Sequence, residues 1–400
     1  MRGSGLAFSS LVGGDTDYDE RIINYPDGSV YTGTVITKES KPQRDGFGKQ
    51  TGADGQVYEG EWKDDKMHGR GKQTWIDPRV YEGDGKGKIT DSIGDKYVGN
   101  FVNDKHHGKG VFTWINGNKY DGDWVDDNMH GKGVFTWPNG DKYEGDYVND
   151  DMLGNGVFTA ASGTKYWGEW KDDEKNGKGK QVWPDGKVYE GEWKDNNING
   201  RGKHIWPDGK VYEGEFKDNK MNGRGKQTWP DGKVYEGEFK DNNRTGRGKH
   251  IWPDGKVYEG EFKDDKMNGT GKITWVDGGV YEGEFKDNLL NGRGKHNWPN
   301  GGVYEGEFKY GKMNGIGKYI WPDGKVYEGE WRYDKMHGRG TMIWEVPDDH
   351  RRSYTGNWVN DYMENGTTTW DDGMQYFGHH PMTYDDFIQV RMPPDTLQSF

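Results

Sequence analysis

The fold is decided by a 23-residue stretch, Tyr189–Val211, which reads YEGEWKDNNINGRGKHIWPDGKV. Its opening tyrosine returns every 23 residues at Tyr97, Tyr120, Tyr143, Tyr166, Tyr189, Tyr212, Tyr235, Tyr258, Tyr281, Tyr304 and Tyr327. A fixed period this short indicates a chain of stacked units, each of which contacts only its neighbours. We therefore expect a surface that runs along the stack and does not close on a pocket, which favours a scaffold over an enzyme.

Each unit contains two predicted β-strands joined by a hairpin loop. Aromatic, acidic and glycine residues alternate along Tyr189–Trp193 with the period of two that belongs to a strand lying on a core. The polar segment Lys194–Asn199 follows, and we expect the chain to reverse at Asn199–Gly200, where glycine tolerates positive φ. The second strand, Gly200–Trp206, alternates again. The predicted core face consists of Tyr189, Gly191, Trp193, Gly200, Gly202 and Trp206.

The opposite face of the unit is charged. It carries Glu190 and Glu192 on the first strand and Arg201 and Lys203 on the second. We expect cross-strand ion pairs among them, each worth roughly 0.2–1 kcal/mol. On the core face, glycine between two aromatic residues leaves room for a ring to lie flat, so we expect Gly191→Val to disrupt packing more than Glu190→Ala.

The composition is consistent with a thin core made of rings. Hydrophobic residues make up 30% of the 400 residues, and aromatic residues alone make up 14%. Cysteine is absent and no apolar leader follows Met1, which favours a reducing, cytoplasmic compartment. A net charge of −13 argues against binding to nucleic acid and weighs against anionic lipid, because both attract positive charge.

The recurring string YEGEWKDxxMNGRGKxxWPDG resembles the MORN (membrane occupation and recognition nexus) repeat, and the resemblance covers roughly residues 21–376. It implies an all-β protein in which stacked 23-residue hairpins form an elongated, twisted antiparallel sheet, a solenoid with a groove-like face. The chain then divides into an N-terminal tail (residues 1–20), the repeat array (21–376) and a C-terminal tail (377–400).

Three units depart from the period, at residues 31–57, 81–96 and 327–353. The unit at 81–96 has lost its hairpin loop, so we expect the sheet to kink or pinch there. The unit at 31–57 has extra residues in the loop around Lys38–Arg44. The unit at 327–353 has a longer turn to the next repeat, through Val346–Arg352. Terminal repeats of such arrays are normally atypical.

None of the residue patterns predicts a catalytic, cofactor or metal site. The chain contains no G-x-S-x-G, Walker A or H-E-x-x-H sequence. Asp195–Gly200 matches the first half of an EF-hand loop, but Trp206 stands where a bidentate glutamate is needed. His204, His250 and His296 recur in every second unit, which places them about 19 Å apart in a sheet, too far to share one metal ion. We expect a packing or surface role for them and no enzymatic activity.

Two segments are candidates for partner binding. The residue nine positions after the tyrosine is apolar in ten of thirteen full-length units. Methionine packs adaptably against rings, so this stripe either caps neighbouring tryptophans or forms a rail for a partner helix or peptide. The candidates for the rail are Met67, Met129, Met221, Met267, Met313 and Met336. In the C-terminal tail, Phe387, Ile388 and Val390 form an apolar cluster that either folds back on the last hairpin or docks onto a partner.

The resemblance implies two functions of different classes. The first is a structural scaffold that binds proteins in a cytoskeletal or axonemal assembly similar to a radial spoke, with a second MORN protein or a second copy among its partners. The second is a module that binds membrane phosphoinositides and links the membrane to the cytoskeleton. The acidic balance and the paired glutamates weigh against the second.

Overall fold

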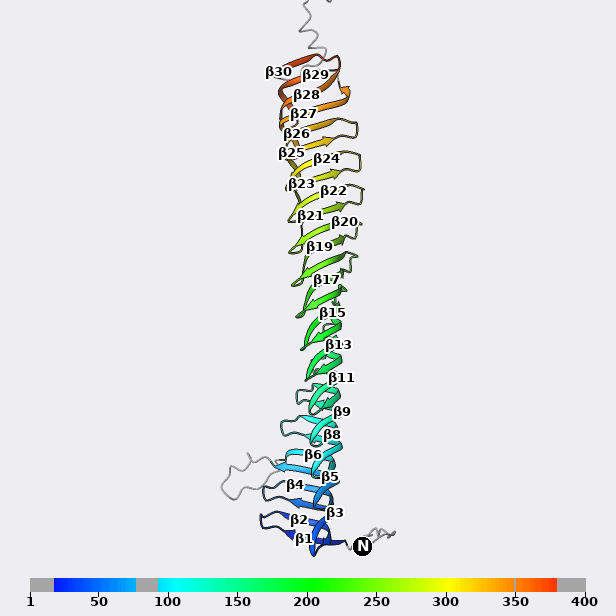
Figure 1. Ribbon diagram of the computed structural model, residues 1–400, viewed down its shortest axis with the longest axis vertical. Helices are drawn as coiled ribbons and strands as arrows, with labels where there is room; N and C mark the ends of the chain where they lie inside the picture. Colours follow the sequence, from blue (N-terminus) through cyan, green and yellow to red (C-terminus); the bar gives the residue numbers. More distant parts are fainter. Residues whose placement is uncertain (1–17, 77–92, 349, 380–400) are drawn as a thin grey trace, which may run out of the picture. The chain divides into compact units, whose positions relative to one another are not determined.

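The computed structural model describes residues 18–76, 93–348 and 350–379. In these residues every regular element is a β-strand, and no helix is present. Strands that follow one another in sequence pair antiparallel, as β1 does with β2 and β2 with β3. Successive hairpins stack along each half of the chain, one hairpin for each repeat (Figure 1). The predicted class, an all-β stack of antiparallel hairpins, is confirmed.

The chain forms two compact halves, Met1–Asn197 and Ile198–Phe400. The strands of the N-terminal half are β1 (Asp19–Asn24), β2 (Val30–Lys38), β3 (Lys41–Thr51), β4 (Val57–Lys63), β5 (Lys66–Ile76), β6 (Ile93–Val102), β7 (Lys105–Thr113), β8 (Lys119–Val125), β9 (Asn128–Thr136), β10 (Lys142–Val148), β11 (Asp151–Thr159), β12 (Lys165–Lys171), β13 (Glu174–Val182) and β14 (Val188–Lys194).

The C-terminal half begins within β15. Its strands are β15 (Asn197–Ile205), β16 (Val211–Lys217), β17 (Lys220–Thr228), β18 (Val234–Lys240), β19 (Asn243–Ile251), β20 (Val257–Lys263), β21 (Lys266–Thr274), β22 (Val280–Lys286), β23 (Leu289–Asn297), β24 (Val303–Lys309), β25 (Lys312–Ile320), β26 (Val326–Arg332), β27 (Lys335–Asp348), β28 (Arg351–Val359), β29 (Tyr362–Trp370) and β30 (Gln375–His379).

The hairpins turn at a different place from the one predicted. The chain reverses at Asp195 (φ 47°) and Asn196 (φ 63°), and β15 has already begun before Asn199–Gly200. A two-residue turn of this kind needs positive φ at both central residues, and Asp and Asn tolerate that conformation better than other non-glycine residues. The predicted reversal at Asn199–Gly200 is therefore wrong.

The glycine that was assigned to the turn forms a β-bulge instead. In β16 and β17, Gly214 pairs with Gly225 and Phe216 pairs with Met221, so the register shifts between these two pairs. Gly223 lies in the bulge with φ of 86°, a conformation that strongly favours glycine. The bulge recurs in most repeats, and it makes the second strand longer than the first.

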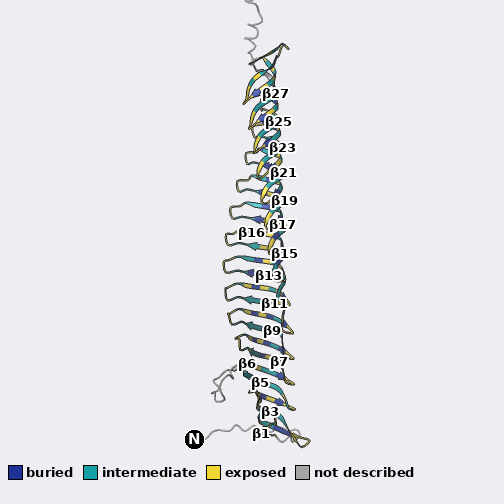
Figure 2. Cartoon of the chain, turned by 90° about the vertical axis from the view of Figure 1, so that its left-hand side faces the viewer, coloured by how far each residue is buried: buried dark blue, intermediate teal, exposed yellow. Residues whose placement is uncertain are grey.

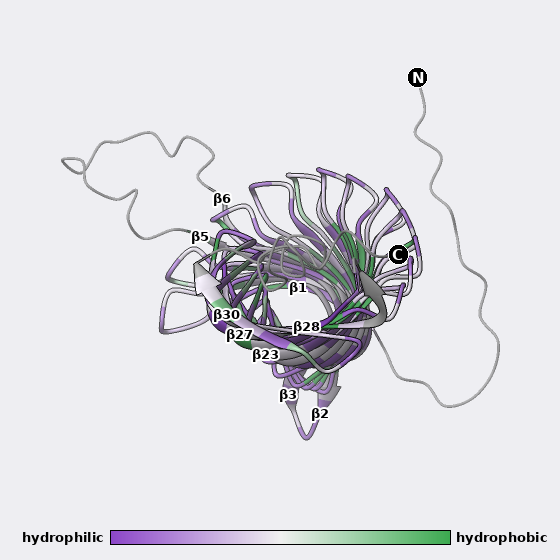
Figure 3. Ribbon diagram, turned by 90° about the horizontal axis from the view of Figure 1, so that it is seen from above, coloured by the Kyte–Doolittle hydropathy of each residue, from purple (hydrophilic) through white to green (hydrophobic). Residues whose placement is uncertain are grey.

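Buried residues alternate with more exposed ones along the first strand of a repeat, as in β8 and β10, and Figure 2 shows the two classes in dark blue and yellow. The tyrosine that opens each repeat is buried, and so is the Trp, Phe or Tyr four positions later. The loop ends of the hairpins are hydrophilic and project away from the strands (Figure 3). A single sheet face covered with rings thus serves as the core of each half.

The irregular units differ from the expectation in part. In the N-terminal half, β5 pairs directly with β6, so the ladder is continuous there, while most of the unit at 81–96 lies outside the described residues. The four-residue insertion lengthens β2 and β3, which pair as far as Lys38 and Lys41. In the C-terminal half, β27 extends to Asp348 and pairs there with Arg351 of β28. The long turn predicted through Val346–Arg352 is therefore mostly strand.

Candidate functional site

One face of the array is filled by the repeated tyrosine. Tyr212 is 0% exposed, and its ring meets Phe216 of its own strand and Phe239 of the next hairpin edge-on, with centroids 5.0 Å apart in both pairs. Its hydroxyl donates a hydrogen bond to the carbonyl oxygen of Glu215 at 2.9 Å. Burial raises the pKa of Tyr212 well above its ordinary value, because the phenolate would lose its hydration. This hydroxyl is consequently a structural donor.

The ring lies over a pair of glycines. Gly214 and Gly225 are partners across β16 and β17. A Cβ atom on Gly225 would lie 2.3 Å from the Tyr212 hydroxyl oxygen, and one on Gly214 would lie 2.5 Å from the Cα of Gly225. Real Cβ atoms do not approach other atoms so closely, so both positions require glycine. The rings and glycines of each half therefore interlock.

The predicted core residues of the N-terminal half lie on this face. Tyr189 is fully buried, and Trp193 packs edge-on against it with ring centroids 5.3 Å apart. The Trp193 indole N–H donates to the carbonyl oxygen of Gly179 at 3.2 Å. Gly191 is the cross-strand partner of the same Gly179.

The predicted core residues of the C-terminal half are placed in the same pattern. Gly200 pairs with Phe216 and Gly202 pairs with Gly214, across β15 and β16. Trp206 is half-buried.

The three periodic histidines each stack on the tryptophan of their own repeat. The centroid distances are 4.1, 4.1 and 4.0 Å for His204–Trp206, His250–Trp252 and His296–Trp298. Burial, followed by the charge of the neighbouring Arg244, lowers the pKa of His250 to about 4. Among the described residues no group of three or more His, Asp or Glu side chains is placed to hold a metal ion.

The predicted stripe nine positions after the tyrosine also lies on the aromatic face. Met221 is the cross-strand partner of Phe216, and it is 9% exposed. Its backbone N–H donates to Asn242 Oδ1 of the next hairpin at 2.9 Å. The same bond, at 2.7–2.9 Å to the Asp or Asn of the next hairpin, is made by Met67, Met129, Met267, Met313 and Met336. The geometry favours ring capping, and a partner rail along this stripe stays a prediction.

Cations replace methionine at two places in the stripe and at the equivalent place in the irregular first repeat. Lys175 Nζ lies 5.1 Å from the ring centroids of both Tyr166 and Trp193, and burial lowers the pKa of this ammonium. Arg244 lies 5.5 Å from the ring centroid of Tyr235. The equivalent residue of the irregular first repeat is Arg44, which lies 4.0 Å from the ring of Trp62. These contacts are cation–π interactions, so the side chain at this position packs on aromatic rings whether it is a methionine, a lysine or an arginine.

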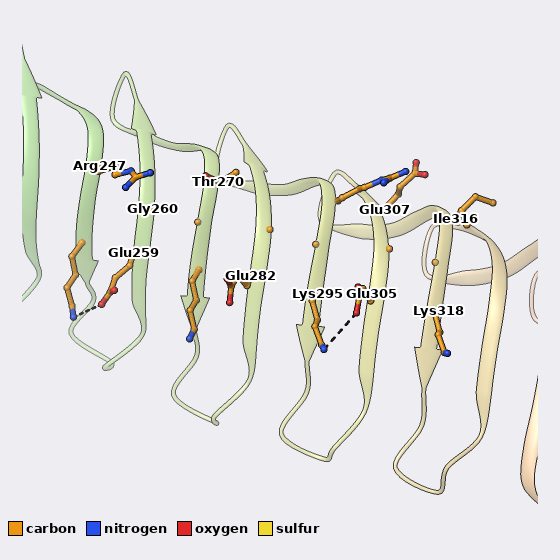
Figure 4. A pocket seen from close by; sticks show the side chains of 18 of the residues that line it. Arg247, Glu259, Gly260, Thr270, Glu282, Lys295, Glu305, Glu307, Ile316 and Lys318 are labelled. Carbon is orange, nitrogen blue, oxygen red and sulfur yellow. Dashed lines mark ion pairs between the residues drawn. The ribbon is translucent and has the colours of Figure 1, made fainter.

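The opposite face of the C-terminal half is a charged groove. A concavity of about 1190 Å³ runs along β19 to β26 and is lined by alternating lysines and glutamates, with paired glycines between them (Figure 4). Ion pairs of 2.5, 3.8 and 3.9 Å join Lys249–Glu259, Lys295–Glu305 and Lys318–Glu328. All of these side chains are about half exposed or more, so the groove is accessible to a partner.

The ion pairs connect successive hairpins, and this corrects the pairing expected inside one hairpin. Lys203 pairs with Glu213 of the following hairpin at 3.8 Å, and Glu190 pairs with Lys180 of the preceding one at 3.3 Å. The second glutamate of a repeat has another role. Glu284 accepts a hydrogen bond from the backbone N–H of Arg293 at 3.0 Å, next to the bulge. Sequence alternation placed these residues on the correct face but could not identify their partners.

The tail residues Phe387, Ile388 and Val390, proposed for docking, lie outside the described residues. Among the described residues there is no helix with the length and apolar character needed to span a bilayer.

Comparison with protein families identifies the repeat. The family model for the MORN repeat matches fourteen segments, at residues 43–57, 58–77, 97–119, 120–142, 143–165, 166–188, 189–211, 212–234, 235–257, 258–280, 281–303, 304–326, 327–345 and 354–375. The chain therefore belongs to the MORN-repeat family and consists almost entirely of its repeats. Such repeats indicate a scaffold that binds proteins or associates with membranes, and a fold of this type is typically non-enzymatic.

Wider comparisons add little. A search of curated proteins found no match. Among solved structures, the TCP domain of SAS-4 from Drosophila melanogaster, in complex with a proline-rich motif of Ana2, is 14% identical over 45% of this chain and 85% of that one, with a TM-score of 0.24. The TCP10 domain of Danio rerio CPAP is 13% identical over 55% of this chain and 93% of that one, with a TM-score of 0.21. Similarity this low supports no argument about function.

Proposed function

We propose that the protein is a structural scaffold that binds other proteins along its sheet, in a cytoplasmic cytoskeletal or axonemal assembly of the radial-spoke kind. The observation that supports this proposal is the open charged groove of the C-terminal half, lined by residues from Arg247 to Glu328. The groove is a long, regular surface in which paired glycines expose the backbone, and lysines and glutamates on either side supply both signs of charge. Such a surface suits another polypeptide better than a small molecule.

The energetics of the groove also favour a protein partner. Exposed ion pairs such as Lys295–Glu305, at 3.8 Å, are each worth about 0–1 kcal/mol, so a partner can exchange its own charges for them at little cost. A partner with acidic and basic side chains at matching intervals would gain several such contacts at once. Complementary charge of this kind raises association rates and selects partners.

A phosphoinositide-binding module that links membrane and cytoskeleton is the alternative. The groove lysines would have to bind the phosphate groups, but Lys249, Lys295 and Lys318 each stand beside a glutamate of the next hairpin, so a phosphate would also have to approach that carboxylate. An anionic surface would repel those glutamates. Flotation with vesicles that contain or lack phosphoinositides tests this alternative. Binding that weakens with salt would favour the membrane function and count against the scaffold.

Site-specific photo-crosslinking tests the scaffold. A photoreactive amino acid at Ile316, which is exposed in the groove, should give adducts with identified cytoskeletal or axonemal proteins, or with a second copy of the chain. The same probe at Val276, which is exposed but does not line the groove, is the control. Charge reversal by Lys295→Glu with Lys318→Glu should abolish the adducts at Ile316. Equal adducts at both probe positions, or none at Ile316, would contradict the proposal.

A further inference from the structure

The groove face of the N-terminal half has a different chemistry from that of the C-terminal half. In the C-terminal half the second strand of a repeat places a lysine beside the first glutamate of the neighbouring strands, and the series is Lys203, Lys226, Lys249, Lys272, Lys295 and Lys318. In three successive repeats of the N-terminal half, valine replaces this lysine. A tryptophan replaces one of the glutamates. Because lysine is compatible with the same strand in six repeats, the fold does not require these apolar residues.

The replacements form one continuous row across neighbouring strands. Cross-strand pairs join Val98 to Val111, Val111 to Asp121, Asp121 to Val134, Val134 to Glu144, Glu144 to Val157 and Val157 to Trp167. We call these seven residues the valine row. Val98 is 43% exposed and Trp167 is 39% exposed, although both are large apolar side chains. Beyond Trp167 the row returns to Lys180, which is ion-paired with Glu190.

Five residues of the valine row, all but Val98 and Val111, line a concavity. A hollow of about 890 Å³ is lined by the valines from β9 and β11, by Trp167 and by the acids Asp121 and Glu144. Lys109 and Lys132 stand on one side of it, and they are ion-paired with Asp123 and Asp146 at 2.7 and 2.5 Å. The hollow is therefore an apolar strip with two acids inside it.

The two acids of the row lack the cross-strand lysines that surround their counterparts. Asp121 lies between Val111 and Val134, and Glu144 lies between Val134 and Val157. Each forms an exposed ion pair with a lysine of its own strand, at 3.7 Å for Lys119–Asp121 and 3.0 Å for Lys142–Glu144. Pairs this exposed are weak, so both carboxylates are available to a cation from a partner.

We propose that the valine row binds a basic amphipathic helix of a partner protein, laid along the direction in which the strands are stacked. The valines of alternate strands are about 9.6 Å apart, since neighbouring strands lie about 4.8 Å apart. Residues seven apart on an α-helix are about 10.5 Å apart, so one apolar residue per heptad meets successive valines. Lysines or arginines three and four residues further on then face Asp121 and Glu144. Trp167, at the end of the row, packs against the last apolar residue of the helix, because indole rings are common anchors of interfaces.

This inference rests on the proposed scaffold function and narrows its partner for the N-terminal half. The probe is a fluorescein-labelled synthetic helix of about three heptads, with leucine once per heptad, lysine three and four residues later, and alanine elsewhere. Anisotropy titration of the full chain with this peptide should show binding that weakens as salt is added. The same peptide with glutamate for lysine, or with its sequence scrambled, should bind at least tenfold more weakly.

Variants that restore the charged row supply the decisive comparison. Val134→Lys with Trp167→Glu introduces the residues that other repeats have at these positions, so the sheet should remain folded, as circular dichroism would verify. We expect this double variant to lose at least tenfold in affinity for the basic peptide. Val276→Lys, at an exposed valine of the C-terminal half that does not line the groove, is the matched control and should leave the affinity unchanged.

The contradicting results are distinct. Equal affinity of wild type and double variant, or equal affinity for basic and acidic peptides, would overturn the inference. A wild-type dimer that the double variant cannot form, seen by analytical ultracentrifugation, would instead assign the valine row to a second copy of the chain. If photo-crosslinking at Ile316 gives the expected adducts but the basic peptide does not bind as expected, the scaffold proposal is retained and the proposal of a helical partner is rejected. If crosslinking itself fails, the scaffold proposal is the one that falls.

Discussion

Replacing Gly225 by alanine adds one methyl group where the repeat has no room for it. The new Cβ would lie 2.3 Å from the Tyr212 hydroxyl oxygen and 2.5 Å from two carbons of its ring. The ring cannot move aside easily, because Phe216 and Phe239 meet it edge-on from both sides. Either the ring moves out of its site or the two strands separate.

The expected cost follows from these contacts. Overpacking of a dense core by one methyl group costs about 1–3 kcal/mol. Displacement of the ring also weakens the hydrogen bond from the Tyr212 hydroxyl to Glu215, worth about 1 kcal/mol. We therefore expect Gly225→Ala to lower the local free energy of opening by about 3 kcal/mol. Lys226→Ala changes the next residue, whose side chain is exposed on the charged face, and should change the same free energy by less than about 0.5 kcal/mol.

Hydrogen exchange is the appropriate measurement, since an array of repeats opens locally and one global transition would average the effect. A loss of about 3 kcal/mol makes exchange of the amides in β16, β17 and β18 roughly a hundredfold faster. Repeats further along the C-terminal half should be unaffected. If Gly225→Ala and Lys226→Ala gave the same exchange rates in these strands, the interlocking of rings and glycines would not be what holds the hairpins together.

Three further outcomes are expected. The pKa of His250 in the folded protein is about 4, below the ordinary 6.5, so its contribution to stability is complete above pH 6.5 and is lost as pH falls toward 4. Hydrogen exchange of the β19 amides should therefore show a loss of roughly 2 kcal/mol in local stability at pH 5. The variant His250→Gln should not show this loss. Met221→Gln should cost about 1–2 kcal/mol in local unfolding, because a polar amide would replace the cap on Phe216, and an unchanged stability together with lost partner binding would favour the rail. Asn242→Gly keeps the positive φ but removes the acceptor of the Met221 N–H, and should cost about 1 kcal/mol by the same exchange measurement.

The periodicity was sufficient to predict the strands and their faces. Alternation placed Tyr189 and Trp193 on the buried face, and the fixed spacing of the tyrosines predicted one hairpin per repeat. The turn was misplaced because Asn199–Gly200 has the composition of a hairpin turn. The structure uses Asp195 and Asn196 there, and it uses the glycine for a bulge. Composition alone does not distinguish a glycine required by a turn from one required by a bulge.

Partners across strands could not be predicted, because they depend on register. The ion pair of Lys203 with Glu213 joins successive hairpins, and sequence alternation is equally compatible with a pair inside one hairpin. The valine row was missed for a different reason. Its signal was present as the replacement of lysine by Val134 and of glutamate by Trp167, but these residues become neighbours only once the register is known.

The regularity of the charged groove has a thermodynamic consequence for whatever occupies it. A ligand that binds at the Lys249–Glu259 pair can also bind two repeats further along, at the Lys295–Glu305 pair, with a nearly identical binding energy. The groove has four such lysines, Lys249, Lys272, Lys295 and Lys318, so this degeneracy adds a statistical contribution of about 0.8 kcal/mol to binding while leaving the location of the bound molecule undefined. Ile316, which lines the groove at the position held by Arg247 and Arg293 in other repeats, breaks this regularity and can fix where a bound chain stops.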